Sequence, residues 1–329
     1  MKTVTYSKNV FIPLTTVCAN NCTYCHFKEA VSEAKIMSMD EIQDILQKAK
    51  EAGCKEVLFT CGTKPEQVSD FKKKLQQKTG FDSWISFVIA ACQEALKQGL
   101  LPHSNIGVVE KDELKELANY NASLGLMLET TADLKAHTHS PTKTFEVRRD
   151  FIAAAGELKI PFTSGLLLGI GESRQDRIAS LEELKKLFQQ YGHLQEVILQ
   201  PVDPPSNSHL FTPKVEVLID TLQLANEILA EDIAVQVPPN LVDLEEIPVE
   251  LIDDLGGVST LTPDYINPDH QWPKIKELKN LFPEVEFQER LPIYSQYLNQ
   301  KWIRKSVWDC LQSEGWLDEY RAKRDFSKS

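Results

Sequence analysis

Cys18, Cys22 and Cys25 carry the most distinctive chemistry in this sequence. Thiolate is a soft ligand that favours zinc, Cu(I) or iron–sulfur clusters, and spacers of three and two residues bring three thiolates into one loop. A [4Fe–4S] cluster can accept four thiolates, so a cluster held by these three cysteines would keep one iron open to another molecule.

Two other interpretations of the cysteines are weaker. Structural zinc normally has four protein ligands in two separated pairs, so a zinc ion would also need His26 or a distant residue. Three unrelated core cysteines are disfavoured because Ala-Asn-Asn and Thr-Tyr separate them, which is loop chemistry rather than apolar packing.

A second group of residues lies in the segment 165–173, where a predicted strand meets a helix. Gly169 and Gly171 let the backbone turn tightly or approach a ligand closely, and Glu172 follows them directly. Taken alone, such glycines also occur in turns that need them for geometry only.

Charged and ionisable side chains follow other predicted strands. Glu66 follows the second strand, Glu129 ends the fourth, and Arg148 begins the next helix. A carboxylate and an arginine suit the ammonium and carboxylate of an amino-acid ligand, but an internal ion pair and a solvated helix residue explain them as well. His137 and His139 are one residue apart, which without further ligands nearby is more typical of loop structure or substrate contact than of a metal site.

Repeated β/α units must position these residues. Short apolar runs alternate with segments of helical period almost to the end of the chain, which is typical of a parallel sheet with crossover helices. A helix is predicted over 39–52, capped near Ser38 or Asp40 and ended by Gly53. Strands are predicted over 9–14, 56–60, 105–108, 124–128, 162–168, 196–200 and 234–237.

Strands of this apolar character predict a (β/α) barrel of the TIM type, complete or nearly complete, over residues 1–275. The motif residues fall at the carboxyl ends of strands, where such barrels keep their active sites. The proline-rich stretch 201–213 is long enough for an active-site loop. Residues 276–329, with three tryptophans, are expected to be helices that pack on the barrel.

The composition is that of an ordinary soluble chain. Of the 329 residues, 42% are hydrophobic and 26% are charged, with no long apolar run and no apolar leader after Met1, so we expect a cytoplasmic protein without a membrane segment. The seven cysteines fit a reducing compartment. A net charge of −12 without a basic stripe argues against a nucleic-acid partner and favours a small substrate that is not strongly anionic.

The pattern Cys-x3-Cys-x2-Cys, with Tyr24 before the last cysteine, resembles the signature of the radical S-adenosylmethionine superfamily. The resemblance implies a [4Fe–4S] cluster on the three cysteines, whose open iron chelates S-adenosylmethionine, and one-electron cleavage to a 5′-deoxyadenosyl radical. A donor such as ferredoxin or flavodoxin would supply the electron. The residues that the resemblance assigns to S-adenosylmethionine are Tyr24, Glu66, Glu129, Arg148, Gly169, Gly171 and Glu172.

From Tyr6 to about Pro273 the chain resembles one family of this superfamily, the ring-forming component of 7,8-didemethyl-8-hydroxy-5-deazariboflavin synthase. The matching stretches are 9–15, 58–66, 103–107, 125–129, 137–141, 160–163, 169–172, 195–198, 238–241 and 256–259.

This family resemblance implies a lyase whose substrate is a small neutral adduct of a tyrosine-derived 4-hydroxybenzyl group and a ribityl-aminouracil. A second component of the synthase, the adduct-forming component, is also a radical SAM enzyme and makes this adduct. Hydrogen abstraction, ring closure and loss of ammonia then give the deazaflavin. His139 and Glu66 are candidates for the proton transfers by residue type and placement.

Two stretches depart from the family pattern. Thr63 stands where the family usually has Glu, so Glu66 or another carboxylate would have to meet the ammonium group of S-adenosylmethionine. The loop 200–209 also differs, which leaves a paralogue with another substrate as an alternative. A non-catalytic iron–sulfur electron-transfer protein is a further alternative, since it would need the cysteine loop but not the glycine turn.

Overall fold

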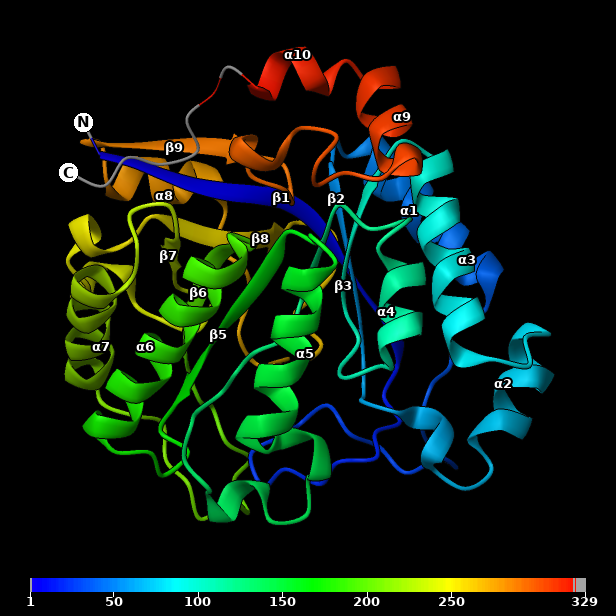
Figure 1. Ribbon diagram of the computed structural model, residues 1–329, viewed down its shortest axis with the longest axis horizontal. Helices are drawn as coiled ribbons and strands as arrows, with labels where there is room; N and C mark the ends of the chain where they lie inside the picture. Colours follow the sequence, from blue (N-terminus) through cyan, green and yellow to red (C-terminus); the bar gives the residue numbers. More distant parts are fainter. Residues whose placement is uncertain (1, 322, 324–329) are drawn as a thin grey trace.

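A closed barrel of parallel strands forms the centre of this computed structural model, which describes residues 2–321 and 323 (Figure 1). The barrel strands are β1 (Lys2–Thr15), β2 (Glu56–Cys61), β3 (Leu101–Asn105), β4 (Ser123–Gly125), β5 (Phe162–Leu168), β6 (Leu194–Pro201), β7 (Ala234–Gln236) and β8 (Asp254–Ser259). They follow the order of the chain, and β1 closes the barrel by pairing with both β8 and β2. The predicted TIM-type fold is confirmed.

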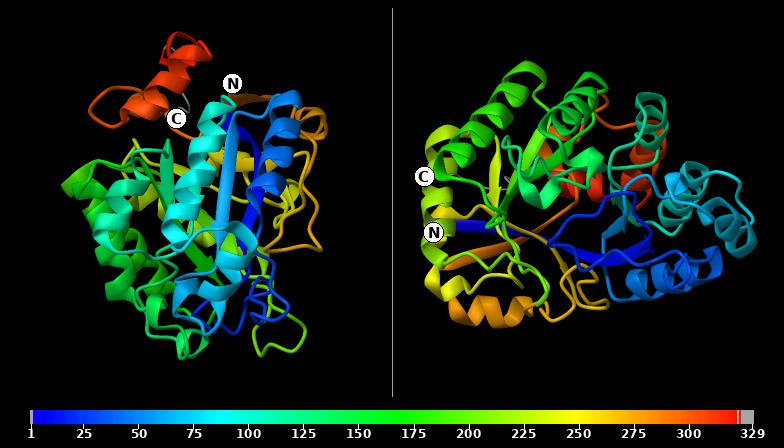
Figure 2. Two further views of the ribbon diagram at one scale, coloured as in Figure 1. Left: turned by 90° about the vertical axis from the view of Figure 1, so that its right-hand side faces the viewer. Right: turned by 90° about the horizontal axis from the view of Figure 1, so that it is seen from below.

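Helices cover the outside of the barrel on most sides (Figure 2). They are α1 (Met39–Glu51), α2 (Phe71–Thr79), α3 (Trp84–Lys97), α4 (Lys111–Leu117), α5 (Phe145–Glu157), α6 (Arg174–Tyr191), α7 (Val215–Ile228) and α8 (Ile275–Leu281). Ser38 and Glu41 form a capping box, which starts α1 where the sequence predicts. None of the described helices has the length and apolar character needed to cross a membrane.

Four strands differ from the sequence prediction by more than two residues. β1 begins at Lys2 rather than at residue 9. β3 is formed by 101–105 rather than 105–108, because its polar side chains face the barrel interior and hide the apolar pattern of a strand. β4 ends at Gly125, before the predicted end at residue 128. β8 was not predicted, because the pair Gly256-Gly257 is more typical of a turn.

The segment after residue 275 is not purely helical, in contrast to the prediction. It contains β9 (Val285–Arg290), which pairs in parallel with the first half of β1. α9 (Lys305–Ser313) and α10 (Trp316–Arg321) follow, and their apolar side chains form a second core with residues at the amino ends of β3 and β7. These helices lie at the top of Figure 1 and the cysteine loop, in dark blue, at the bottom, so the C-terminal segment covers the end of the barrel remote from the cysteines.

Candidate cluster and cofactor site

The cysteine loop follows β1 and is held by two neighbouring loops. The backbone N–H of Ala19 donates to the carbonyl of Thr63 at 2.9 Å, and that of Asn21 donates to the carbonyl of His139 at 3.0 Å. These partners follow β2 and β4. Three elements of the barrel therefore fix the conformation of the loop.

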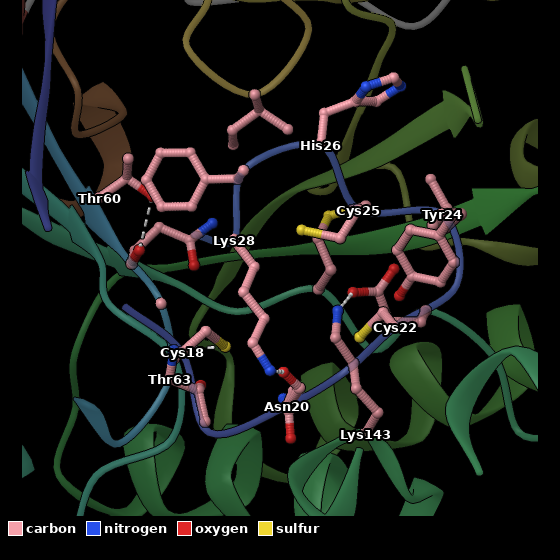
Figure 3. Close-up of a pocket in the computed structure, with 18 of the residues that line it drawn as sticks. Cys18, Asn20, Cys22, Tyr24, Cys25, His26, Lys28, Thr60, Thr63 and Lys143 are labelled. Carbon is pink, nitrogen blue, oxygen red and sulfur yellow. Dashed lines mark hydrogen bonds and ion pairs between the residues drawn. The ribbon is translucent and has the colours of Figure 1, made fainter. Parts of the chain in front are cut away.

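The three cysteine side chains are partly exposed and line one cavity of about 220 Å³ at the carboxyl end of the barrel (Figure 3). Cys18 Sγ accepts a hydrogen bond from the backbone of Thr63 at 3.3 Å, and Cys22 Sγ lies 3.1 Å from Ser140 Oγ. Burial raises the pKa of Cys25, and the nearby Cys22 and Cys18 add to the increase. Hydrogen bonds to cysteine sulfur are one of the means by which proteins tune iron–sulfur clusters.

The donor set fits a polynuclear cluster. In a [4Fe–4S] cluster each thiolate binds a different iron, so the thiolates surround the cluster instead of meeting at one ion. Among the residues that the structure describes, no three His, Cys, Asp or Glu side chains converge on one metal ion. Three soft thiolates on one loop facing a common cavity nevertheless offer the ligand type and number that such a cluster requires.

Tyr24, Glu129 and Arg148 line the same cavity, so the structure brings these predicted residues together with the cysteines. The Tyr24 hydroxyl lies 3.0 Å from His137 Nε2. The carboxylate of Glu129 pairs with Lys143 and lies 3.7 Å from Arg148 Nη1. Burial opposes ionisation of Glu129, but the charges of Lys143 and Arg148 outweigh it and lower the pKa. Glu129 is therefore an ionised carboxylate facing the cysteine cavity.

Two other predicted residues are placed elsewhere. Glu66 lies in the short helix 65–67 on the outside of the barrel, where its carboxylate accepts a hydrogen bond from Trp84 N at 3.2 Å. Glu66 thus pairs with a backbone N–H group in the first turn of α3 instead of facing the cysteines. His139 is exposed, and it is its backbone carbonyl that contacts the cysteine loop. Within the described lining of the cavity, neither residue takes part.

The glycine turn after β5 is held by its own glutamate. Glu172 accepts hydrogen bonds from the backbone N–H groups of Gly169 and Ile170 at 3.0 and 2.9 Å. Gly169 and Gly171 have φ angles of 90° and 108°, which favour glycine. Ile170 belongs to a small apolar cluster that Tyr24 joins, so the turn lies beside the cysteine loop while the carboxylate of Glu172 points back into the turn.

Sequence reasoning missed several polar residues of this cavity, including two lysines. Lys28 Nζ donates to the carbonyl of Asn20 at 2.6 Å. Lys143 pairs with Glu129 and lies 5.6 Å from the centre of the Tyr24 ring. Both lysines are drawn with the cysteines in Figure 3. The nearness of Lys28 to the last cysteine was a usable signal, whereas nothing in the sequence marks Lys143.

The divergent loop 200–209 reaches the cavity through Gln200, Val202 and Asp203. The carbonyl of Asp203 lies 3.0 Å from His26 Nε2, and its carboxylate lies 2.9 Å from His270 Nε2. One residue therefore links the cysteine loop to the segment after β8. The proline-rich stretch lies at the cavity, as expected of an active-site loop.

Comparison with known proteins identifies the family. The radical SAM superfamily matches residues 12–184. Over 97% of this chain and 100% of the relative, the sequence is 45% identical to 7,8-didemethyl-8-hydroxy-5-deazariboflavin synthase from Methanosarcina barkeri. The chain belongs to this family. It is also 41% identical to the synthase from Archaeoglobus fulgidus, over 97% of this chain and 99% of the relative.

Solved structures agree with this fold. The [FeFe]-hydrogenase maturase HydG from Carboxydothermus hydrogenoformans has a TM-score of 0.63 at 17% identity, over 86% of this chain and 66% of the maturase. Methylornithine synthase has a TM-score of 0.60 at 17% identity, over 87% of this chain and 84% of that chain. As a radical SAM member of the synthase family, the chain uses a [4Fe–4S] cluster and S-adenosylmethionine.

Proposed function

We propose that this chain is a radical lyase that forms 7,8-didemethyl-8-hydroxy-5-deazariboflavin from the adduct of a 4-hydroxybenzyl group and a ribityl-aminouracil, with release of ammonia, 5′-deoxyadenosine and methionine. The observation that carries the proposal is 45% identity along a whole synthase. The cavity in which three cysteines lie with an ionised carboxylate supports it.

In this proposal Cys18, Cys22 and Cys25 hold the cluster. When bound, the cluster and S-adenosylmethionine supply the 5′-deoxyadenosyl radical that abstracts hydrogen. The protein positions the cofactors and restricts water. Tyr24 and the neighbouring glycine turn at 169–171 offer an apolar surface beside the cysteine loop for the adenosine.

Glu129 and Arg148 are the proposed partners of the ammonium and carboxylate groups of S-adenosylmethionine. Thr63 stands where the family usually has Glu, but a carboxylate partner for the ammonium group remains in Glu129. Thr63 gives its backbone to the cysteine loop, and its hydroxyl accepts a hydrogen bond from Val108 N at 3.2 Å. Because Glu66 lies outside the cavity, Glu129 is the better placed carboxylate.

The proposal includes two protein partners and a compartment. The adduct-forming component of the synthase would supply the substrate, and a donor such as ferredoxin or flavodoxin would supply the electron. All seven cysteines are free, which fits a reducing compartment such as the cytoplasm. His139 and Glu66, the candidates for proton transfer, are given no role at the reacting atoms because neither is in the described cavity lining.

Anaerobic turnover tests the proposal. The reconstituted protein is mixed with an adduct-forming component, tyrosine, the ribityl-aminouracil, S-adenosylmethionine and reductant, and deazaflavin fluorescence should appear. The control lacks this protein, because the adduct-forming component also cleaves S-adenosylmethionine. Extra 5′-deoxyadenosine without deazaflavin would favour a paralogue with another substrate. Neither product from a protein with a full cluster would favour the electron-transfer alternative.

A further inference from the structure

The interior of the barrel holds a second cavity, adjacent to the cysteine cavity. Its volume is about 160 Å³, and the two cavities share five residues in their walls, Asn105, Met127, Gln200, Ile266 and Asn267. TIM barrels are usually filled by branched apolar side chains, whereas polar side chains line this interior. A molecule in the interior cavity would lie directly against the proposed site of S-adenosylmethionine.

An ion network closes the floor of the interior cavity. Arg290 donates to Asp254 through Nε at 2.6 Å and Nη2 at 2.7 Å, and Nη2 also donates to Glu196 at 2.7 Å. Arg290 Nη1 donates to the carbonyl of Leu291 at 2.9 Å, and the Tyr294 hydroxyl donates to Glu196 at 3.0 Å. Because each nitrogen of the guanidinium group has a protein partner, recognition of a ligand falls to the walls.

Three carboxamides on the walls have buried polar atoms without a hydrogen-bond partner among the described residues, those of Asn9, Gln236 and Asn240. The Trp272 indole N–H is a further such group. The amide nitrogen of Asn240 is held by Asp264 at 2.9 Å, so Asn9 and Gln236 are the less constrained carboxamides.

Asn9 of β1 is 0% exposed, and its side-chain polar atoms make no hydrogen bond of ordinary geometry among the described residues. Its amide lies beside the buried carboxylate of Glu56 on β2; burial raises the pKa of Glu56, and the Asn9 amide acts against that increase. Gln236 of β7 is 7% exposed, and its Oε1 has no hydrogen-bond partner within the described chain. A buried polar group without a partner destabilises the folded state, so its presence in a pocket wall points to a ligand that pairs with it.

The strand between Asn9 and Gln236 is shaped to admit them. A Cβ atom at Gly256 of β8 would lie 2.1 Å from Gln236 Nε2, and one at Gly257 would lie 2.1 Å from Asn9 Nδ2. No larger residue fits without moving a carboxamide. The two glycines that obscured β8 in the sequence are therefore explained by the amide groups packed against them.

His103 of β3 adds a hydrogen-bond acceptor to the interior cavity. His103 Nδ1 lies 2.7 Å from the hydroxyl of Ser123, which donates its proton to the carbonyl of Pro292 at 2.6 Å. The hydroxyl has only one proton, so it must accept from Nδ1–H, which leaves Nε2 of His103 as an acceptor. Burial lowers the pKa of His103 to about 3, so the ring is neutral.

We propose that Asn9 and Gln236 hold the pyrimidine ring of the substrate inside the barrel. The edge of a ureide ring presents adjacent N–H and C=O groups in one plane, and a carboxamide presents the complementary pair. A polyol such as the ribityl chain has no fixed planar pattern of this kind. The inference rests on the proposed function, because it assigns one part of that substrate to named residues.

Calorimetry of ribityl-aminouracil binding to the cluster-loaded protein under anaerobic conditions tests this assignment. Asn9→Leu and Gln236→Met keep the size of the side chain and remove its hydrogen bonding, so each should weaken binding by about tenfold or more. Gln236→Met should unfold at the same or a higher urea concentration than the wild type, because Gln236 Oε1 has no hydrogen-bond partner among the described residues. A purely structural role would instead lower that concentration.

Asn226→Leu is the matched control. It removes a carboxamide of α7 that bonds to the carbonyls of Leu222 and Leu251 outside both cavities, so affinity should equal that of the wild type. A second probe is an analogue methylated at the ring N–H. It should bind the wild type more weakly than the parent molecule does, while the two variants should bind both molecules equally.

Three results would decide against part of the account. Unchanged affinity in both Asn9→Leu and Gln236→Met would overturn the inference. The inference would also be overturned if the variants bound ribitol more weakly than the wild type does but bound the uracil ring equally well. The carboxamides would then contact the sugar chain. If the wild type forms deazaflavin and the variants bind the ribityl-aminouracil as tightly as the wild type does, only this inference fails. If the wild type binds the ribityl-aminouracil but forms no deazaflavin, the proposed function is contradicted.

Discussion

The two cavities of the barrel differ in how their polar groups are paired. At the mouth, which is the cysteine cavity, loops supply ionisable groups that pair with one another, such as Glu129 with Lys143, around partly exposed thiols. In the interior cavity, strands supply the groups, and the ion network of the floor is paired. Gln236 Oε1 has no hydrogen-bond partner within the described chain, and Asn9 makes no hydrogen bond of ordinary geometry there. The mouth is thus equipped to hold charged cofactors, and the interior to recognise a neutral ring.

Removal of the thiolates should have the largest effect, confined to the mouth. The triple variant Cys18→Ala, Cys22→Ala, Cys25→Ala should hold no cluster and form no 5′-deoxyadenosine, as measured by iron and sulfide analysis and chromatography. Because these side chains are partly exposed, the free energy of unfolding of the cluster-free protein should change by less than about 1 kcal/mol. Cys310→Ala, at a buried cysteine of α9, should keep the cluster. A full complement of iron in the triple variant would refute the ligand assignment.

Breaking the interior floor should lower stability instead. Arg290→Met leaves Asp254 and Glu196 buried without their cation, so the free energy of unfolding should fall by about 3–5 kcal/mol in urea titrations. Arg149→Met removes a surface pair with Asp150 and should cost less than about 1 kcal/mol. A loss no greater than that of the surface variant would show that the floor does not depend on this network.

A smaller effect should identify the carboxylate that meets S-adenosylmethionine. Glu129→Gln should weaken its binding by about tenfold, because a charge-assisted hydrogen bond becomes a neutral one. Glu172→Gln should weaken the binding less than Glu129→Gln does, since that side chain bonds to its own turn and acts on the cofactor only through that turn. Calorimetry on the cluster-loaded proteins measures both, and a larger loss in Glu172→Gln would reverse the assignment.

The mouth could be predicted largely from the sequence, because its residues lie in short local patterns. The cysteine spacing marks the loop, and Arg148 lies in the first turn of α5 as expected. The position of Glu66 could not be predicted. Its carboxylate accepts a hydrogen bond from the backbone of α3, and no local pattern in the sequence indicates this contact.

The interior could not be predicted, because its features depend on pairings between distant segments. Asn9 lies in an apolar strand and becomes an interior group only when β1 pairs with β8. Arg290 reaches the floor because β9 pairs with the start of β1, nearly the whole chain away. Gly256 and Gly257 resemble a turn until the side chains of the neighbouring strands are known.

The most direct test of this division is the yield of deazaflavin per 5′-deoxyadenosine, measured with preformed adduct at a concentration of S-adenosylmethionine below its Kd for the wild type. In Gln236→Met, the account predicts that S-adenosylmethionine is still cleaved but that less deazaflavin forms per 5′-deoxyadenosine than in the wild type. In Glu129→Gln, both products should fall in proportion. A proportional loss of both products in Gln236→Met would contradict the separation of cofactor binding at the mouth from substrate binding in the interior.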